Sequence, residues 1–396
     1  MPGDCSTQAR ALLALTFIPG LGPVRIAQLI AALGSPEAVL GASASQFARI
    51  RGIGATTAGN IAKHLHPSIE RIDEELSKIA DAGAHVISIV DPQYPPMLAQ
   101  IPSPPPILMV KGQFDHVTKN RYTVSIVGSR SCSIYGSEQA NRFAGAFAQA
   151  GLTVVSGGAR GIDTAAHHGA LKAGGSTAVV LGCGIGRVYP PENARLFDEI
   201  VAQGGAIISE LPVNTIPDAK NFPARNRIIS GLSLGVLVIE AGLKSGSLIT
   251  ARQAIEDHGR EVMGLPGRVD SPASAGTHDL LKNGAHLVTD PSDVISILER
   301  DAFHLYSGSH AAITADPSRQ PNQSPPPIGD APLLPAPVGD VDDQTRQILE
   351  ALTESRTGDQ LAEILSIDTG ALRAKMTMLE IQGRVRRVGS KFERVR

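Results

Sequence analysis

The sequence has few of the residues that build aromatic, thiolate or disulfide-based sites. It lacks tryptophan, and aromatic side chains make up 4% of its 396 residues. We therefore expect any ligand site to depend on charge and backbone groups more than on aromatic stacking. Three cysteines, Cys5, Cys132 and Cys183, are odd in number and show no C-x-x-C spacing. This pattern argues against a disulfide framework or a cysteine-based zinc site and favours a reducing compartment.

Long apolar runs and an excess of charge are also missing. The one apolar stretch near the N-terminus, Ala11 to Ile18, is too short to span a bilayer, and no cleavage-like site follows it. The formal net charge is −2, so bulk charge does not indicate nucleic-acid binding. A phosphate-binding site would need a local cluster of Arg and Lys. The simplest prediction is a soluble, cytoplasmic protein.

The chain divides into four segments by composition. Residues 1–80 are rich in Ala and Leu with a helical period, and residues 81–303 alternate strand and helix. Residues 304–340 are rich in Ser, Pro and Ala, a composition that does not bury a core and predicts a flexible linker. Residues 341–396 are expected to form a winged-helix-like domain. Its predicted parts are helices at 342–353, 359–366 and 369–382, followed by a basic, hairpin-like tail.

Two glycine-containing repeats lie in the first segment. Ile18–Arg25 and Ile50–Thr57 each follow the pattern apolar-x-Gly-apolar-Gly and precede a predicted helix. In a helix-hairpin-helix, such glycines allow a tight turn, and N–H groups at the start of the next helix face a phosphate. The alternative is a pair of hairpins packed only for stability, since each copy has a single nearby base, Arg25 or Arg51. Both alternatives stay open for this small, SAM-like helical domain.

Residues 81–303 have the pattern of an extended Rossmann-like, doubly wound α/β sheet. Several predicted strands are continuous apolar runs, as expected for parallel strands covered on both faces by helices such as 134–150. Two earlier strand-like runs, 84–90 and 107–111, flank a proline-rich loop and are expected at the sheet edge. The strands of the main pattern are predicted at 122–127, 152–156, 177–181, 206–209, 235–240 and 261–265.

Small and basic residues lie beside the ends of several of these strands. In an open α/β sheet, ligands bind at the carboxyl ends of the strands. Glycine and serine turns let a backbone approach a phosphate, helix N-termini direct N–H groups at it, and arginine adds charge and bidentate geometry. We therefore predict an anion-binding site that consists of Gly128, Ser129, Arg130, Ser156, Gly157, Gly158, Arg160, Gly161, Asp163, Arg225, Asn226, Arg227, Lys244, Ser245, Gly246, Ser247 and Thr250.

The five bases of this set each have a structural alternative to phosphate binding. Arg225 and Arg227, in particular, could cap helices or pair with acids, and the candidate acids are Glu210 and Glu240. If all five bases contact phosphates, affinity for a single strand should fall with salt with a log–log slope of roughly −3.5, from about −0.7 per contact.

The titratable residues near these turns show no catalytic pattern. Asp163 is expected to orient Arg160 or to cap the following helix, not to act as a base. His167 and His168 lie inside a predicted helix without a partner at metal-ligand spacing, so structural roles are expected. We therefore predict no catalytic residue and no metal.

Nucleotide-cofactor motifs fail in detail. The dinucleotide fingerprint needs G-x-G-x-x-G after the first strand and an acid about twenty residues later. The first turn here is Gly128-Ser-Arg-Ser-Cys-Ser, and the Gly182 turn has Arg187 at the last fingerprint position. The string from Gly242 to Leu248 reverses the Gly-Lys-Ser order of a Walker motif. NAD binding and ATP hydrolysis are not supported, and no cofactor is expected.

Five segments of the chain, taken in order, resemble motifs of the DprA/Smf family of bacterial DNA-processing proteins. The similarity covers residues 84–290. The matching strings are Ile126–Arg130, Ser156–Asp163, Asn221–Gly231, Glu240–Ala251 and Gly259–Gly267. In one place the chain departs from the family motif: Gly-x-Asn before a Leu-Ile pair is replaced by Gly276-Thr-His278-Asp-Leu-Leu281.

The resemblance implies a specific function. Members of this family bind single-stranded DNA in a basic pocket, usually as homodimers, protect incoming DNA during natural transformation and load RecA recombinase onto it. Carried over residue by residue, the resemblance implies a pocket lined by the turns at Gly128, Gly157 and Gly246, with the bases Arg130, Arg160, Arg225, Arg227 and Lys244.

Two rival functions fit parts of the sequence less well. The first is a nucleotide phosphoribohydrolase of the lysine-decarboxylase-like type, whose glycine-rich loop carries a catalytic acid. The comparable loop here, from Ala241 to Thr250, has Lys244 and no acid, which suits a phosphate ligand better. The second rival is a sequence-specific regulator that uses the C-terminal domain. Its candidate recognition helix holds Arg373 and Lys375 among core-like residues, so we expect protein docking or weak DNA contact instead.

Overall fold

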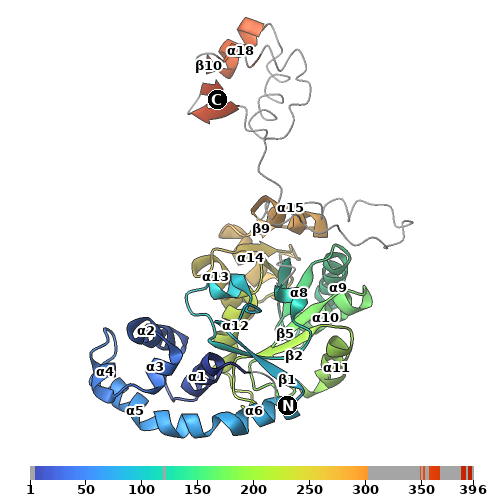
Figure 1. The fold of residues 1–396 in the computed structure, drawn as a ribbon. Coiled ribbons are helices and arrows are strands. Elements are labelled where there is room, and N and C mark those ends of the chain that lie inside the picture. Colours follow the sequence, from blue (N-terminus) through green and yellow to red (C-terminus); the bar gives the residue numbers. More distant parts are fainter. Residues whose placement is uncertain are drawn as a thin grey trace, which may run out of the picture. The chain divides into compact units, whose positions relative to one another are not determined.

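The computed structural model describes residues 5–118, 122–301, 348, 351–352, 356–365, 385–388 and 391–394 (Figure 1). The chain forms two compact units, Met1–Gln320 and Pro321–Arg396. The linker predicted at 304–340 lies outside the described residues. Among the described helices, none combines the length and the apolarity that a membrane crossing needs.

A nine-stranded sheet runs through the first unit, in the order β1-β2-β6-β5-β4-β3-β7-β8-β9. The seven strands numbered β3 to β9 pair with one another in parallel, whereas β2 pairs antiparallel with both β1 and β6. The chain builds outward from β3 to β6 and then returns to β7 on the other side of β3, so the switch point lies between β3 and β7. The strands are β1 (Ala84–Ser88), β2 (Ile107–Gly112), β3 (Thr123–Val127), β4 (Thr153–Ser156), β5 (Thr177–Val180), β6 (Ala206–Ser209), β7 (Gly235–Val238), β8 (Glu261–Gly264) and β9 (His286–Leu287).

This architecture confirms the predicted doubly wound sheet. Each of the eight predicted strands is present within two residues at either end, and the runs at 84–90 and 107–111 form the β1–β2 edge. The proline-rich loop between them carries a short helix, α7 (Pro96–Ala99), that was not predicted. The prediction also missed the two-residue strand β9, because His286 and Leu287 form no apolar run.

Helices cover both faces of the sheet. Side chains of α9, α10, α11 and α15 pack with one set of strand residues, and side chains of α12 and α13 pack with the alternate set. The helices from residue 115 to residue 301 are α8 (Asp115–Thr118), α9 (Ile134–Gln149), α10 (Ile162–Lys172), α11 (Ala194–Ala202), α12 (Asn221–Gly231), α13 (Ser247–Glu256), α14 (Ala275–Lys282) and α15 (Pro291–Asp301), with a 3-10 turn at Pro191–Asn193.

The N-terminal helices form the predicted helix-hairpin-helix domain. Gly20 and Gly52 have φ values of +77° and +86°, a conformation that side chains disfavour, and Gly22 and Gly54 are the N-caps of the following helices. This domain shares a core with the sheet: Leu12 and Leu15 of the first helix belong to the same buried cluster as strand residues. The helices are α1 (Thr7–Thr16), α2 (Pro23–Leu33), α3 (Pro36–Leu40), α4 (Ala44–Ala48), α5 (Ala55–Glu70) and α6 (Ile72–Asp81).

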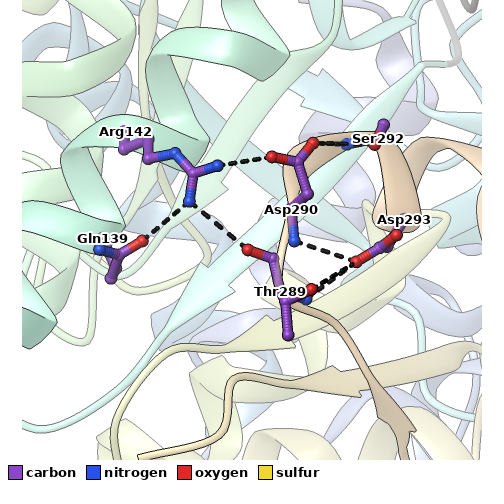
Figure 2. Close-up of polar contacts among 6 residues, drawn as sticks. All are labelled: Gln139, Arg142, Thr289, Asp290, Ser292 and Asp293. Atoms are coloured by element: carbon purple, nitrogen blue, oxygen red, sulfur yellow. Dashed lines mark hydrogen bonds and ion pairs between the residues drawn. The ribbon is translucent and has the colours of Figure 1, made fainter.

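A polar cluster fixes α15 against α9 (Figure 2). Arg142 forms an ion pair with Asp290 at 2.5 Å and donates to the carbonyl of Thr289 at 3.5 Å. Asp290 also accepts the N–H of Ser292 at 3.0 Å, and Asp293 accepts the N–H of Asp290 at 3.0 Å. The start of α15 is therefore both capped and tied to α9.

The second unit has a winged-helix-like domain. A three-stranded antiparallel sheet pairs β12 (Lys391–Arg394) with β10 (Arg356–Thr357) and with β11 (Val385–Val388). α18 (Gly358–Leu365) corresponds to the helix predicted at 359–366, and β11 and β12 form the predicted basic hairpin. The helix predicted at 369–382, with Arg373 and Lys375, lies outside the described residues.

Candidate functional site

A cavity opens in the first unit at the switch point, where β3 and β7 end. Its volume is about 770 Å³. This is the position that the topology predicts for a ligand, because the loops after β3 and β7 diverge in opposite directions there. The predicted residues that line it are Gly128, Ser129, Arg130, Asp163, Arg225, Asn226, Lys244, Ser245, Gly246, Ser247 and Thr250.

A second, small cavity of about 20 Å³ shares part of this lining. It adds two further predicted residues, Gly157 and Arg160, to Arg130 and Arg225. The strand-end turns predicted to converge are thus brought together. The remaining four predicted residues, Ser156, Gly158, Gly161 and Arg227, line neither cavity.

Three of those four residues have structural roles in the turn after β4. The Ser156 hydroxyl donates to the carbonyl of Ile126 at 2.6 Å. A Cβ on Gly158 would lie 2.7 Å from Val179, and a Cβ on Gly161 would lie 2.3 Å from the Ser129 carbonyl oxygen. These small residues let the turn after β4 pack directly on β5 and on the turn after β3.

Arg130 and Lys244 are the exposed cations of the larger cavity. In the described part of the chain, neither side chain has an ion pair. The Arg130 guanidinium lies 4.8 Å from the centroid of the Phe222 ring, which orients it without neutralising its charge. Both positive charges therefore remain available to an anionic ligand.

Arg225 has a different environment. It is 4% exposed, and its Nη1 donates to the carbonyl of Gly157 at 2.8 Å and to the carbonyl of Val180. Burial lowers the pKa of Arg225 to about 10, with Asp163 acting in the opposite direction, so the side chain remains cationic at neutral pH. Arg225 joins the ends of β4 and β5 and also belongs to the lining of the cavity.

Two other predicted bases are paired within the protein. Arg227 forms a largely buried ion pair with Glu210 at 2.5 Å, the structural alternative suggested by the sequence. Arg160 pairs with Glu192 on the surface. Because of this pair, Asp163 does not orient Arg160, contrary to one of the two roles that the sequence suggested.

Asp163 instead holds the turn before its own helix. Its Oδ2 accepts the N–H of Gly157 at 3.1 Å and the N–H of Ala159 at 3.2 Å. Burial raises the pKa of the Asp163 carboxyl, and the nearby Arg225 opposes that rise. An acid engaged by two backbone donors suits a structural role better than proton transfer.

The helix N-termini around the cavity differ in their access to a ligand. Glu240, 4% exposed, accepts the N–H of Ser133 at 2.7 Å, so a carboxylate of the protein already occupies the start of α9. In a dinucleotide-binding fold, the helix after the first strand would instead face the pyrophosphate. No carboxylate lies at the start of α13 among the residues that line the cavity there, which are Ser245, Gly246 and Ser247; the Ser247 N–H meets the Ser245 hydroxyl at 3.4 Å. An anion would therefore meet α13 and not α9.

Sequence reasoning missed two aromatic residues of the lining. Tyr189 and Phe222 lie with ring centroids 5.8 Å apart, and Arg130 stacks on Phe222. Phe222 lies in the quoted string Asn221–Gly231, and the scarcity of aromatics elsewhere in the chain was the signal that could have singled it out.

The described residues offer no obvious metal site. No group of three or more His, Cys, Asp or Glu side chains in this part of the chain is placed to hold an ion. His167 is buried, with its Nδ1 2.7 Å from the Thr177 hydroxyl, and burial lowers its pKa to about 3. Its place in the core agrees with the predicted structural role.

Comparisons with known proteins decide the family. A family model described as DNA recombination-mediator protein A matches residues 85–299, which is more than half of the chain. Protein Smf of Synechocystis sp. is 34% identical, and the match covers 96% of this chain and 98% of that protein. The chain belongs to the DprA/Smf family. Models of a SAM-like helix-hairpin-helix tandem and of a DprA winged helix domain match residues 12–66 and 330–391 of this family member.

Further relatives agree with this assignment. Protein Smf of Escherichia coli is 44% identical over 58% of this chain, and the match covers 60% of that protein. The X-ray structure of DNA processing protein A from Streptococcus pneumoniae superposes with a TM-score of 0.61 at 35% identity, covering 74% of this chain and 97% of that one. A structure of DNA processing protein A from Helicobacter pylori, described as showing a single-stranded DNA binding mode, has a TM-score of 0.50 at 30% identity and covers 55% of this chain and 96% of that one.

Proposed function

We propose that this protein binds single-stranded DNA in the cavity between the ends of β3 and β7. One observation carries the proposal: Arg130 and Lys244 face this cavity without an ion pair among the described residues, beside the start of α13, whose N-cap residue Gly246 has no side chain. A phosphate is the ligand that such donors favour, because two cations and a helix N-terminus attract the same charge. The binding mode described for the Helicobacter pylori relative supports a single strand as the source of that phosphate.

The wider role follows from family membership. We propose that the protein protects incoming single strands during natural transformation and loads RecA recombinase onto them, acting in the cytoplasm as a homodimer. The free cysteines Cys5, Cys132 and Cys183 fit a reducing compartment.

We propose a binding role without turnover. The phosphoribohydrolase alternative needs an acid that works on a sugar. Asp163 is the one carboxylate of the described cavity lining, and it is buried and bound by two backbone N–H groups. Release of free base from nucleoside monophosphates by the wild-type chain would favour the hydrolase instead.

The decisive experiment is a fluorescence-anisotropy titration of an oligothymidylate and a matched duplex, repeated over a range of salt concentrations. We expect tight, salt-sensitive binding of the single strand and weaker binding of the duplex. Absent binding, or equal binding of both, would contradict the proposal and move attention to the terminal domains.

A further inference from the structure

Glu75 is a buried carboxylate that connects the helical domain with the loop between β6 and α12. It lies in α6, is 5% exposed, and accepts the backbone N–H of Val213 at 2.6 Å. Among the described residues it has no ion pair. Burial of a carboxylate is unfavourable unless its hydrogen bonds are made. The bond to Val213 is therefore the contact that stabilises Glu75 where it is.

Val213 in turn is bonded to a second loop, the one that follows β5. The Val213 carbonyl accepts the N–H of Gly186 at 3.0 Å, and the Thr215 carbonyl accepts the N–H of Gly184 at 2.9 Å. A Cβ on Gly184 would lie 2.1 Å from the carbonyl oxygen of Pro212. The two loops are thus in direct backbone contact, and a shift of Val213 would be passed to both.

These two loops lead into the aromatic wall of the cavity. Tyr189 lies at the end of the loop that follows β5, and Phe222 follows the β6–α12 loop at the start of α12. The two rings lie 5.8 Å apart, and Arg130 stacks on Phe222. A displaced loop would therefore move the surface on which one of the exposed cations rests.

We propose that Glu75 is a positioning residue: its carboxylate fixes the 211–215 loop, and through it the Tyr189–Phe222 wall, so that the helical domain sets the affinity of the cavity. The effect on affinity rests on the proposed function, namely that the cavity binds single-stranded DNA. The effect on the loop does not depend on any ligand. No part of the helical domain needs to touch the DNA for this influence to operate.

The test compares three variants of the full chain. Glu75→Met keeps the length of the side chain but removes the acceptor, and Glu75→Gln keeps an accepting oxygen. Glu74→Met is the matched control, because Glu74 is an exposed neighbour that pairs with Lys78. Hydrogen–deuterium exchange of residues 183–188 and 211–216 measures the loops. Anisotropy with a labelled oligothymidylate measures the dissociation constant.

We expect both segments to exchange about tenfold faster in Glu75→Met, because local opening no longer breaks a buried hydrogen bond. Its dissociation constant should rise severalfold, while Glu75→Gln and Glu74→Met stay close to wild type. If Glu75→Met does not fold, Glu75→Asp, whose carboxylate is one methylene too short to reach Val213, replaces it with the same expectation.

Equal exchange in Glu75→Met and Glu74→Met would overturn the positioning role. Faster exchange with an unchanged dissociation constant would overturn the control of affinity. A wild-type chain that does not bind the oligothymidylate would contradict the proposed function alone, and the exchange data would still decide whether Glu75 holds the loop.

Discussion

At the scale of single residues, Arg130 and Arg225 line the same cavity with different consequences. Arg130 is exposed and has no ion pair among the described residues, so Arg130→Ala should weaken binding of all single-stranded sequences. Its loss should flatten the salt slope by about 0.7, the value of one phosphate contact on a single strand. Anisotropy titrations across salt measure both effects. Lys172→Ala, which removes an exposed charge at the end of α10, is the control.

The wild-type protein should show a shallower salt dependence of binding than five phosphate contacts would give. Arg225 and Arg227 are bonded within the protein, and Arg160 is paired with Glu192. If two or three cations make phosphate contacts, the slope should be about −1.4 to −2.1, smaller than the five bases counted in the sequence would give. An unchanged slope in both Arg130→Ala and Lys244→Ala would remove this cavity from the proposed function.

Arg225 should act on stability instead. Arg225→Ala leaves the carbonyls of Gly157 and Val180 without their buried donor and Asp163 without its cation. We expect a loss of about 2–4 kcal/mol in the free energy of unfolding, the range for breaking a buried charged contact. Denaturant titration measures this loss. If Arg225→Ala instead gives a shallower salt dependence of binding and unchanged stability, Arg225 contacts a phosphate of the DNA.

His167 gives a pH dependence with a defined sign. Burial lowers its pKa to about 3 in the folded chain, below the value of 6.5 for an exposed histidine. Its contribution to stability is therefore complete above pH 6.5 and is lost as the pH falls from there toward 3. Between pH 7 and 5 the loss should be about 2 kcal/mol. Denaturant unfolding of wild type and His167→Asn at both pH values should show a smaller decrease in the variant, and equal decreases would contradict this assignment.

At the scale of elements, two glycines of the cavity lining make different demands. A Cβ on Gly128 would lie 2.5 Å from Ile162 of α10, whereas a Cβ on Gly246 would meet no atom within 4 Å. Gly128→Ala should lower the free energy of unfolding by about 1–3 kcal/mol through overpacking. Gly246→Ala should leave the melting temperature unchanged and weaken binding of the oligothymidylate, because its methyl group lies where the ligand approaches α13. Equal melting temperatures for the two variants would contradict this distinction.

The elements show which features of this fold are predictable from sequence. Parallel strands are apolar on both faces, so runs such as 206–209 were assigned from residue type alone. The convergence of their turns followed because the carboxyl ends of parallel strands meet at one edge. The antiparallel pairing of β2 with β6 was not predictable, since no local pattern specifies a partner strand. The burial of Arg225 and the stacking of Arg130 on Phe222 depend on side-chain packing between distant parts of the chain, which no local sequence pattern reveals.

At the scale of the whole molecule, the N-terminal helices and the sheet belong to one compact unit. The N-terminal helices share a buried cluster with the sheet, in which Leu12, Leu15 and Phe47 occur together with Ile107 and Val179. Removal of residues 1–80 would therefore expose apolar strand residues to water and should yield an insoluble or unfolded chain. The C-terminal domain belongs to a separate compact unit that begins at Pro321.

Truncation after Gln320 should consequently leave binding intact. All residues that line the cavity at the switch point lie in the first unit. The dissociation constant of the shortened chain for the oligothymidylate should therefore stay within about twofold of the wild-type value, a smaller change than the loss of one phosphate contact would cause. Its unfolding transition should also keep the wild-type midpoint, because residues 1–320 form a compact unit by themselves. Anisotropy and thermal melting of the 1–320 and 81–396 chains measure the contrast. A 1–320 chain that folds but binds much more weakly would show that the winged-helix-like domain contacts the DNA, and a stable 81–396 chain would show that the sheet does not need the helices that cover it.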